Sequence, residues 1–305
     1  FFWLYRDAIR KRAVSAYEFS VQRFSRLYPL HLVTLVLVAL LQALYFSREQ
    51  KFFVYPNNDP FHFILNLGFA SNWGLEKGLS FNGPVWSVSV EILLYLLFFI
   101  VALMGRGGWI FCVVVSMVAS GLHVVTGHGV FTGAAMFFLG GGVYHLTRWI
   151  TGVRPWIAPV VGGVTLAMWV GVLVHFYGFD LFHLASFLKV PDRILAIGFQ
   201  NYLLFPLTIC SLALLGIHRA GAMRSVSWIG DITYSSYLIH FPMQLILGLA
   251  VSYGILGRDF YKAPVSLIAF FVFLVPVSYW VYRKFEWPMQ RWIRRRCIRS
   301  SDRSD

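Results

Sequence analysis

Residues Phe81–Phe98 read FNGPVWSVSVEILLYLLF, and this stretch decides the fold. Its turn residues lead directly into a long apolar helix, and Pro84 suits the first turn of a helix, where a missing N–H costs nothing. From Pro84 to Met104 the only formal charge is Glu91, and the run is long enough to cross a bilayer. An ionisable group at that depth is costly, so Glu91 is expected to be functional and to have a partner.

The whole chain shares this apolar character. Of its 305 residues 58% are hydrophobic and 13% are charged, and the mean hydropathy is +0.66. Globular domains carry about 25% charged residues. We predict an all-α polytopic transmembrane helical bundle with eight spans. The apolar runs cover about 27–46, 84–104, 108–125, 129–146, 156–177, 195–216, 232–253 and 264–284. Residues 61–73 are apolar but too short to span, which favours an interfacial or re-entrant helix.

The net charge of +13 is distributed as membrane topology requires, so it does not indicate a nucleic-acid partner. If residues 5–26, a basic amphipathic connection, are cytoplasmic, 19 of the 26 Lys and Arg residues lie inside and seven outside. Both termini of this chain are therefore expected in the cytoplasm. We divide the chain into a membrane domain, residues 1–285, and a basic cytoplasmic tail, residues 286–305, suited to anionic lipid headgroups.

Glu91 has two possible roles. It is expected about seven residues into its span, roughly 10 Å deep at 1.5 Å per residue. Ser87 stands four residues earlier on the same helix face, and Asn82 and Trp86 are expected at the membrane interface. Glu91 is either a general base or proton carrier facing a polar cavity, or a structural carboxylate bonded to a neighbouring helix.

Arg23 and Arg26 lie three residues apart at the start of the first span, on one helix face. This spacing suits bidentate hydrogen bonds to a phosphate, although basic residues here can equally anchor the helix on lipid headgroups. His31, one turn further on, is either a ligand or relay or, as is commoner for a lone histidine, a packing residue.

The stretch GDITYSSYLIHFP, residues 230–242, opens the seventh span. Asp231 is expected to cap the helix start. His240 is expected roughly 13 Å from the cytoplasmic face, and Pro242 interrupts the backbone ladder and can open a polar pocket. The sequence favours neither a catalytic nor a structural role for His240 over the other.

The remaining candidates point to structure rather than chemistry. Glu286 is expected to anchor the end of the last span by pairing with Arg283 or Lys284. The glycines of residues 138–142, FLGGG, indicate close helix packing. No histidine pair has the spacing and supporting carboxylate of a metal site, so no metal is expected, and the three cysteines are expected to be packing residues.

Five segments in this order resemble the acyltransferase 3 family of integral-membrane acyltransferases. They are RDAIRKR…QRFSRLYPLHL, FNGPVWSVSVEILLYLLF, FFLGGGVYHL, SWIGDITYSSYLIHFPMQ and YRKFEWPMQRWIRR. The resemblance implies a ten-span core that moves an acyl group, usually acetyl from acetyl-CoA, to a hydroxyl of an extracytoplasmic glycan or glycolipid. It places Arg23 and Arg26 near the CoA phosphates and matches Ser87 and Glu91 to the Ser-x-x-x-Glu motif.

The family carries two further spans before this point, the first with its proposed catalytic histidine. The first two spans are therefore expected to be missing here, and the truncated chain to lack activity by itself. We do not transfer that histidine's role to His31 or His240 on the strength of the resemblance, although the depth of His240 keeps it a catalytic candidate beside Glu91. The main rivals are a proton-coupled glycan or small-molecule transporter with Glu91 as the membrane carboxylate, and a non-catalytic membrane subunit.

Overall fold

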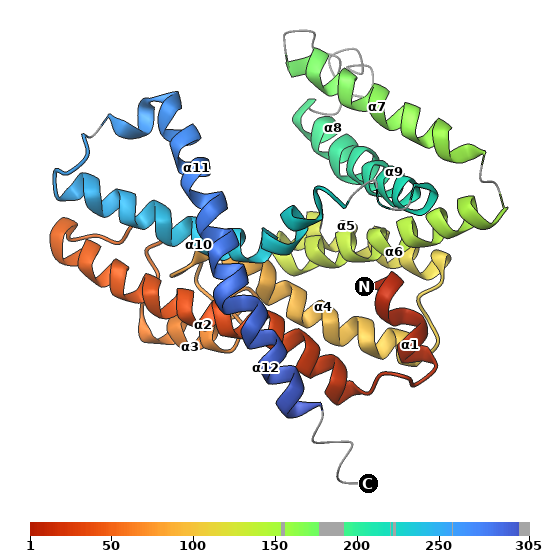
Figure 1. The fold of residues 1–305 in the computed structure, drawn as a ribbon, viewed down its shortest axis with the longest axis horizontal. Helices are drawn as coiled ribbons and strands as arrows, with labels where there is room; N and C mark the ends of the chain where they lie inside the picture. The colour runs from red at the N-terminus through yellow and green to blue at the C-terminus, as the bar shows by residue number, and fades with distance from the viewer. Residues whose placement is uncertain (154–155, 177–191, 220, 222–223, 258, 299–305) are drawn as a thin grey trace. The chain divides into compact units, whose positions relative to one another are not determined.

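The computed structural model describes residues 1–153, 156–176, 192–219, 221, 224–257 and 259–298. Every regular element within these ranges is a helix (Figure 1). In chain order they are η1 (Phe2–Arg6), α1 (Asp7–Arg10), α2 (Ala16–Glu49), α3 (Pro60–Leu67), η2 (Gly83–Val85), α4 (Trp86–Leu103), α5 (Trp109–Thr126), α6 (Gly129–Val153), α7 (Ile157–Phe176), α8 (Asp192–Phe199), η4 (Gln200–Leu204), α9 (Phe205–His218), α10 (Ser227–Ser252), η5 (Phe260–Lys262), α11 (Pro264–Val281), η6 (Tyr282–Glu286) and α12 (Trp287–Cys297).

Within the described residues, eight helical stretches are long and apolar enough to cross a membrane. They coincide with the eight predicted runs, so the chain is an all-α, multi-pass membrane protein. Helix α3 has only eight residues and cannot span, as its short apolar run predicts. Residues 177–191 and the end of the predicted tail, residues 299–305, lie outside the described residues.

The first long helix begins earlier than the apolar pattern indicates. Helix α2 starts at Ala16, so the second half of the predicted basic connection is helical. Ser15 forms a capping box, in which its side chain accepts a hydrogen bond from the Glu18 N–H and the Glu18 carboxylate accepts one from the Ser15 N–H. With 34 residues α2 is about 51 Å long and extends beyond the hydrocarbon core.

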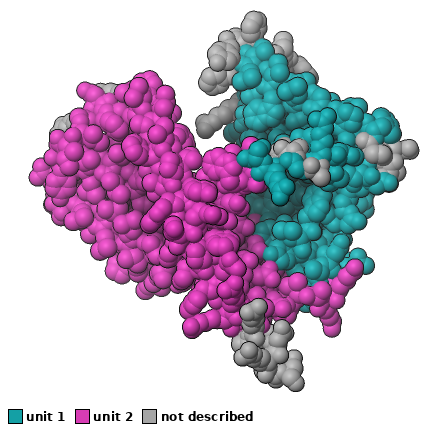
Figure 2. Space-filling view, in the orientation of Figure 1, with its two compact units in different colours: residues 1–10, 100–225 teal, residues 11–99, 226–305 magenta. Residues whose placement is uncertain are grey.

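The chain forms two compact units, coloured separately in Figure 2. The first unit holds residues 1–10 and 100–225. There α5 and α6 pack as an antiparallel pair, and α9 packs against α6 and α7. Its buried cluster contains Val143 and Ile150 of α6 and Cys210 and Leu214 of α9. Helix α6 therefore contacts each of the other long helices of this unit, α5, α7 and α9.

The second unit holds residues 11–99 and 226–305. Helix α10 packs along α2, and α12 and α3 also contact α2. The buried cluster Leu35, Val38, Phe81, Phe241 and Leu245 joins α2, the turn before α4, and α10. Every residue predicted to carry chemistry lies in this unit.

Two π-helical turns have a common cause in the sequence. Turn η4 directly precedes Pro206, and η6 directly precedes Pro288. A proline ring clashes with the carbonyl four residues earlier and offers it no N–H. A wider turn at that place accommodates the missing bond and shifts the face of the helix that follows.

Candidate active site

A hydrogen bond attaches the turn before α4 to α10. It is made to a backbone carbonyl of α10 that Pro242 leaves without a hydrogen-bond donor. Proline has no N–H, so the carbonyl of Leu238 lacks its usual helical donor. The side-chain amide of Asn82 supplies that donor at 3.0 Å. Asn82 is 1% exposed, so this amide is buried within the protein, against α10. This bond places the first turns of α4 beside the middle of α10.

Ser87 and His240 meet at one tyrosine of α10. The Ser87 hydroxyl and the Tyr237 hydroxyl are 2.7 Å apart, and the Tyr237 hydroxyl also donates to the Pro84 carbonyl. His240 Nδ1 lies 2.6 Å from the Tyr237 carbonyl. Because a carbonyl only accepts, Nδ1 carries the hydrogen, and the lone pair of the neutral ring is on Nε2. Tyr237 thus connects the predicted serine to the predicted histidine.

Glu91 lies one turn further along α4 and accepts a hydrogen bond from the Tyr95 hydroxyl. The guanidinium of Arg23 stands 5.7 Å from the centre of the Tyr95 ring and 6.0 Å from that of Phe19. The predicted arginine on α2 and the predicted carboxylate on α4 are therefore linked through Tyr95. Ser87, four residues before Glu91 on the same face of α4, relates this part of the site to the contact with Tyr237.

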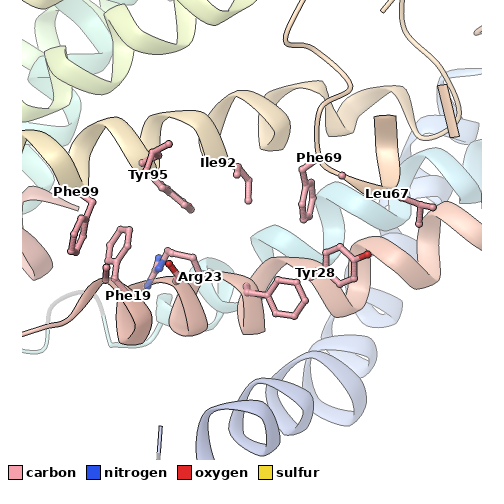
Figure 3. A pocket seen from close by; sticks show the side chains of 13 residues that line it. Phe19, Arg23, Tyr28, Leu67, Phe69, Ile92, Tyr95 and Phe99 are labelled. Atoms are coloured by element: carbon pink, nitrogen blue, oxygen red, sulfur yellow. The ribbon is translucent and has the colours of Figure 1, made fainter. Parts of the chain in front are cut away.

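A cavity of about 420 Å³ opens beside this link (Figure 3). It is bounded by α2, the end of α3 and α4, and Figure 3 shows the Arg23 side chain between Phe19 and Tyr95. Aromatic and aliphatic side chains form most of its wall, and Arg23 is the charged residue among its lining residues. Such a cavity suits a ligand with an apolar body and an anionic or strongly polar group.

Arg26 has different neighbours from Arg23. Its side chain is exposed and does not line the cavity. It acts electrostatically on Tyr234 of α10 and on Glu286. The structure thus directs the two arginines of the predicted phosphate pair toward different helices.

Two expectations about polar residues near α10 are wrong. Glu286 does not serve as a surface anchor for its basic neighbours; it is 4% exposed and accepts hydrogen bonds from Ser235 and Gln290. The π turn η6 accounts for this, because it rotates Glu286 toward α10. Asp231 does not cap α10, which begins at Ser227, and it lies exposed in the second turn.

The short helix α3 is held in place by buried polar groups. His31 is fully buried, donates from Nε2 to the Asn66 carbonyl at 2.8 Å and stacks on Phe69, which is the packing role rather than the ligand role. Asp59 caps the start of α3. Hydrogen bonds from the His62 backbone N–H and imidazole hold the pKa of the Asp59 carboxyl below its usual 3.8. These bonds fix the segment that forms one wall of the cavity.

Sequence reasoning singled out the serine, carboxylate, histidine and arginines but missed the tyrosines that connect them. The sequence contains a signal for Tyr95, because a tyrosine four residues after Glu91 lies on the same helix face. Tyr237 bonds to Ser87 across 150 residues, and no local signal marks that pairing. Across the described residues, no group of three or more His, Cys, Asp or Glu side chains is arranged to hold a metal ion.

The fold and this site define a class: a multi-pass α-helical membrane protein with a half-buried polar cluster contributed by α2, α4 and α10. The chain belongs to the acyltransferase 3 family, whose acyltransferase domain matches residues 1–283. By family it is a membrane acyltransferase. No curated protein and no solved structure gives a significant match to the chain.

Proposed function

We propose that this protein transfers an acyl group, in the first instance acetyl, from an acyl-CoA thioester to a hydroxyl of an extracytoplasmic glycan or glycolipid. The observation that supports this most directly is the linked series of polar groups Arg23–Tyr95–Glu91 beside an apolar cavity, with Ser87, Tyr237 and His240 one to two turns away. A partly buried group of acid–base side chains beside an anion-attracting residue suits acyl transfer from coenzyme A.

The donor is a large polyanion that cannot cross lipid. In the topology favoured by the positive charges, Arg23 and Arg26 lie at the cytoplasmic side, where coenzyme A is available. Arg26 would meet its phosphates, and Arg23 would draw the thioester end into the cavity of about 420 Å³. Aromatic walls there favour the less polar pantetheine arm over the nucleotide.

In the transfer itself, the acceptor hydroxyl oxygen forms a bond to the acyl carbon and the carbon–sulfur bond breaks. The hydroxyl proton passes to a base, and the departing thiolate takes up a proton to give free coenzyme A. Glu91 would accept or direct that proton, and the hydrogen bond from Tyr95, which orients its carboxylate, supports this role. Ser87, Tyr237 and His240 Nε2 offer hydrogen-bonding groups one turn nearer the outer face, where the acceptor would enter.

The test uses the full-length gene product reconstituted in liposomes with acetyl-labelled acetyl-CoA. We expect release of coenzyme A, with label retained in a glycan or glycolipid fraction. Glu91→Gln, which keeps the size of the side chain, should abolish transfer without loss of folded protein. Retained turnover in Glu91→Gln would refute the role of the carboxylate.

The same experiment separates the principal rival. Substrate-dependent flux across the liposome membrane without any acylated product would identify a proton-coupled transporter instead. Arg26→Ala serves as the second variant. Loss of label transfer in both variants would identify Arg26 as part of the donor site and Glu91 as part of the chemical step.

A further inference from the structure

Helix α12 lies beyond the residues matched by the acyltransferase domain, which ends at residue 283. It nevertheless packs along α2, and Figure 1 shows it crossing the first half of that helix. The hydrogen bonds recorded between α12 and α2 fall at Tyr17 and at Gln22 and Ser25, on either side of Arg23 and next to Arg26. The contact therefore falls on the proposed donor site.

Arg294 of α12 makes two hydrogen bonds to the segment of residues 22–27. Its Nε donates to the Ser25 hydroxyl at 3.1 Å, and one terminal nitrogen donates to the Gln22 carbonyl at 3.3 Å. Ser25 is 1% exposed and itself donates to the Gln22 carbonyl at 3.1 Å. The planar guanidinium is suited to such a forked pair of bonds, whereas a lysine ammonium is not.

The segment is held from its other end as well. The Tyr234 hydroxyl of α10 donates to the Leu27 carbonyl at 2.6 Å, in a fully buried position. Arg294 of α12 and Tyr234 of α10 thus bond to three residues of this segment. Gln22 directly precedes Arg23, Ser25 lies between the two arginines, and Leu27 directly follows Arg26. Such an arrangement restricts rotation and sliding of this turn of α2.

The other end of α12 is also anchored. Glu286 precedes α12 and bonds to Ser235 of α10, and Gln290 of α12 donates to Glu286 at 3.1 Å. Glu286 also attracts Arg26 electrostatically. With Glu286 at one end and Arg294 at the other, α12 is a packed part of the bundle.

The other arginines of α12 are directed elsewhere. Arg291 and Arg296 lie over the rings of Trp287 and Trp292 at 4.5 and 4.7 Å, and Arg295 is exposed. Among the arginine bonds that the structure records in α12, those to α2 come from Arg294. Its role can therefore be separated from the general positive charge of the helix.

We propose that Arg294 is a positioning residue of the donor site: it holds residues 22–27 of α2 so that Arg26 presents its guanidinium group to the phosphates of an acyl-CoA while Arg23 faces the cavity. This inference rests on the proposed function. It makes α12 part of the enzyme's donor-binding machinery, although the helix lies outside the family's matched domain.

The experiment measures binding of acetyl-CoA to the full-length gene product by equilibrium titration, together with turnover. For Arg294→Gln we expect binding to weaken about tenfold, as the loss of charge-assisted hydrogen bonds worth about 1.4 kcal/mol would produce. The kcat at saturating donor should stay within about twofold, because Arg294 does not touch the reacting atoms. Arg295→Ala is the matched control, since it removes the same charge from the same helix, and it should bind like the wild type.

A mutant cycle tests the contact itself. Ser25→Ala should weaken binding about threefold, and adding it to Arg294→Gln should cost little more, because both changes remove one interaction. Equal binding by wild type and Arg294→Gln, or an equal loss in Arg295→Ala, would overturn the inference and leave the proposed function standing. Failure of the wild type to bind acetyl-CoA would overturn both.

Discussion

The bond between Asn82 and the Leu238 carbonyl is the most testable feature of the fold. It exists because Pro242 cannot supply the helical donor, and it is buried, with Asn82 1% exposed. Asn82→Ala leaves that carbonyl without a donor in an apolar environment. An unsatisfied buried polar group costs about 1–3 kcal/mol, and interhelical bonds in membranes tend toward the lower end, so we expect a loss of about 1–2 kcal/mol.

The decisive comparison repeats Asn82→Ala in a Pro242→Ala background. Alanine restores the backbone N–H, so the Leu238 carbonyl recovers an intrahelical donor and no longer depends on Asn82. The cost of Asn82→Ala should then fall by about 1 kcal/mol, which is a coupling energy that a double-mutant cycle resolves. Asn82→Asp, which keeps the shape but replaces the amide donor by a carboxylate oxygen, should destabilise at least as much as alanine.

The assay is reversible unfolding in mixed micelles, followed by tryptophan fluorescence and circular dichroism, with free energies of unfolding taken for all four proteins of the cycle. An Asn82→Ala cost that is the same with Pro242 and with alanine at that position would refute the reasoning. In that case the amide would act through packing alone, and the alignment of α4 with α10 would need another cause.

Three further predictions concern the site and the packing around it. Tyr95→Phe removes the hydroxyl that donates to Glu91 and should lower the rate of coenzyme A release about tenfold while the protein stays folded; an unchanged rate would exclude an orienting role. Gly141→Ala should destabilise the protein by about 1–3 kcal/mol, because a Cβ there would lie 2.6 Å from a ring atom of Phe2. The control is Gly140→Ala, whose Cβ would meet nothing within 4 Å and which should leave stability unchanged in a thermal unfolding assay. Because the pKa of Asp59 is lowered in the folded protein, its carboxylate stabilises the fold above the usual carboxyl pKa of 3.8, and this stabilisation is lost as the pH falls through the lowered pKa. Asp59→Asn should therefore lose less unfolding free energy than the wild type on acidification between about pH 5 and pH 2. Parallel curves of unfolding free energy against pH would contradict the assignment.

The predictions that needed only local pattern succeeded. Pro84 lies in the first turn that leads into α4, the eight apolar runs correspond to eight helices long enough to span, and residues 60–67 form a helix too short to cross. Cys112 and Cys210 are buried free thiols, as their apolar surroundings predict. Each of these follows from hydrophobic length or from the backbone limits of one residue type.

Local pattern did not reveal the surroundings of polar residues whose environment depends on a distant helix. Asn82 is buried because Pro242, 160 positions later, leaves a carbonyl for it to satisfy. Glu286 faces α10 because of the π turn before Pro288, not its basic neighbours. Periodicity gives the face of a regular helix, and a π turn changes that face by an amount the pattern does not encode.

The sequence by itself determined the class of protein, the number of spans and the residue types able to carry acyl-transfer chemistry. Burial of an 18-residue apolar helix in a membrane is a local requirement, and it is met in the same way whatever the neighbouring helices do. Only the tertiary structure decided that Tyr95 joins Arg23 to Glu91, that Tyr237 joins Ser87 to His240, and that α12 holds the arginine segment of α2. Those contacts depend on how helices far apart in the chain rotate and pack, and inside a membrane each buried polar group takes its partner from whichever helix that packing brings near.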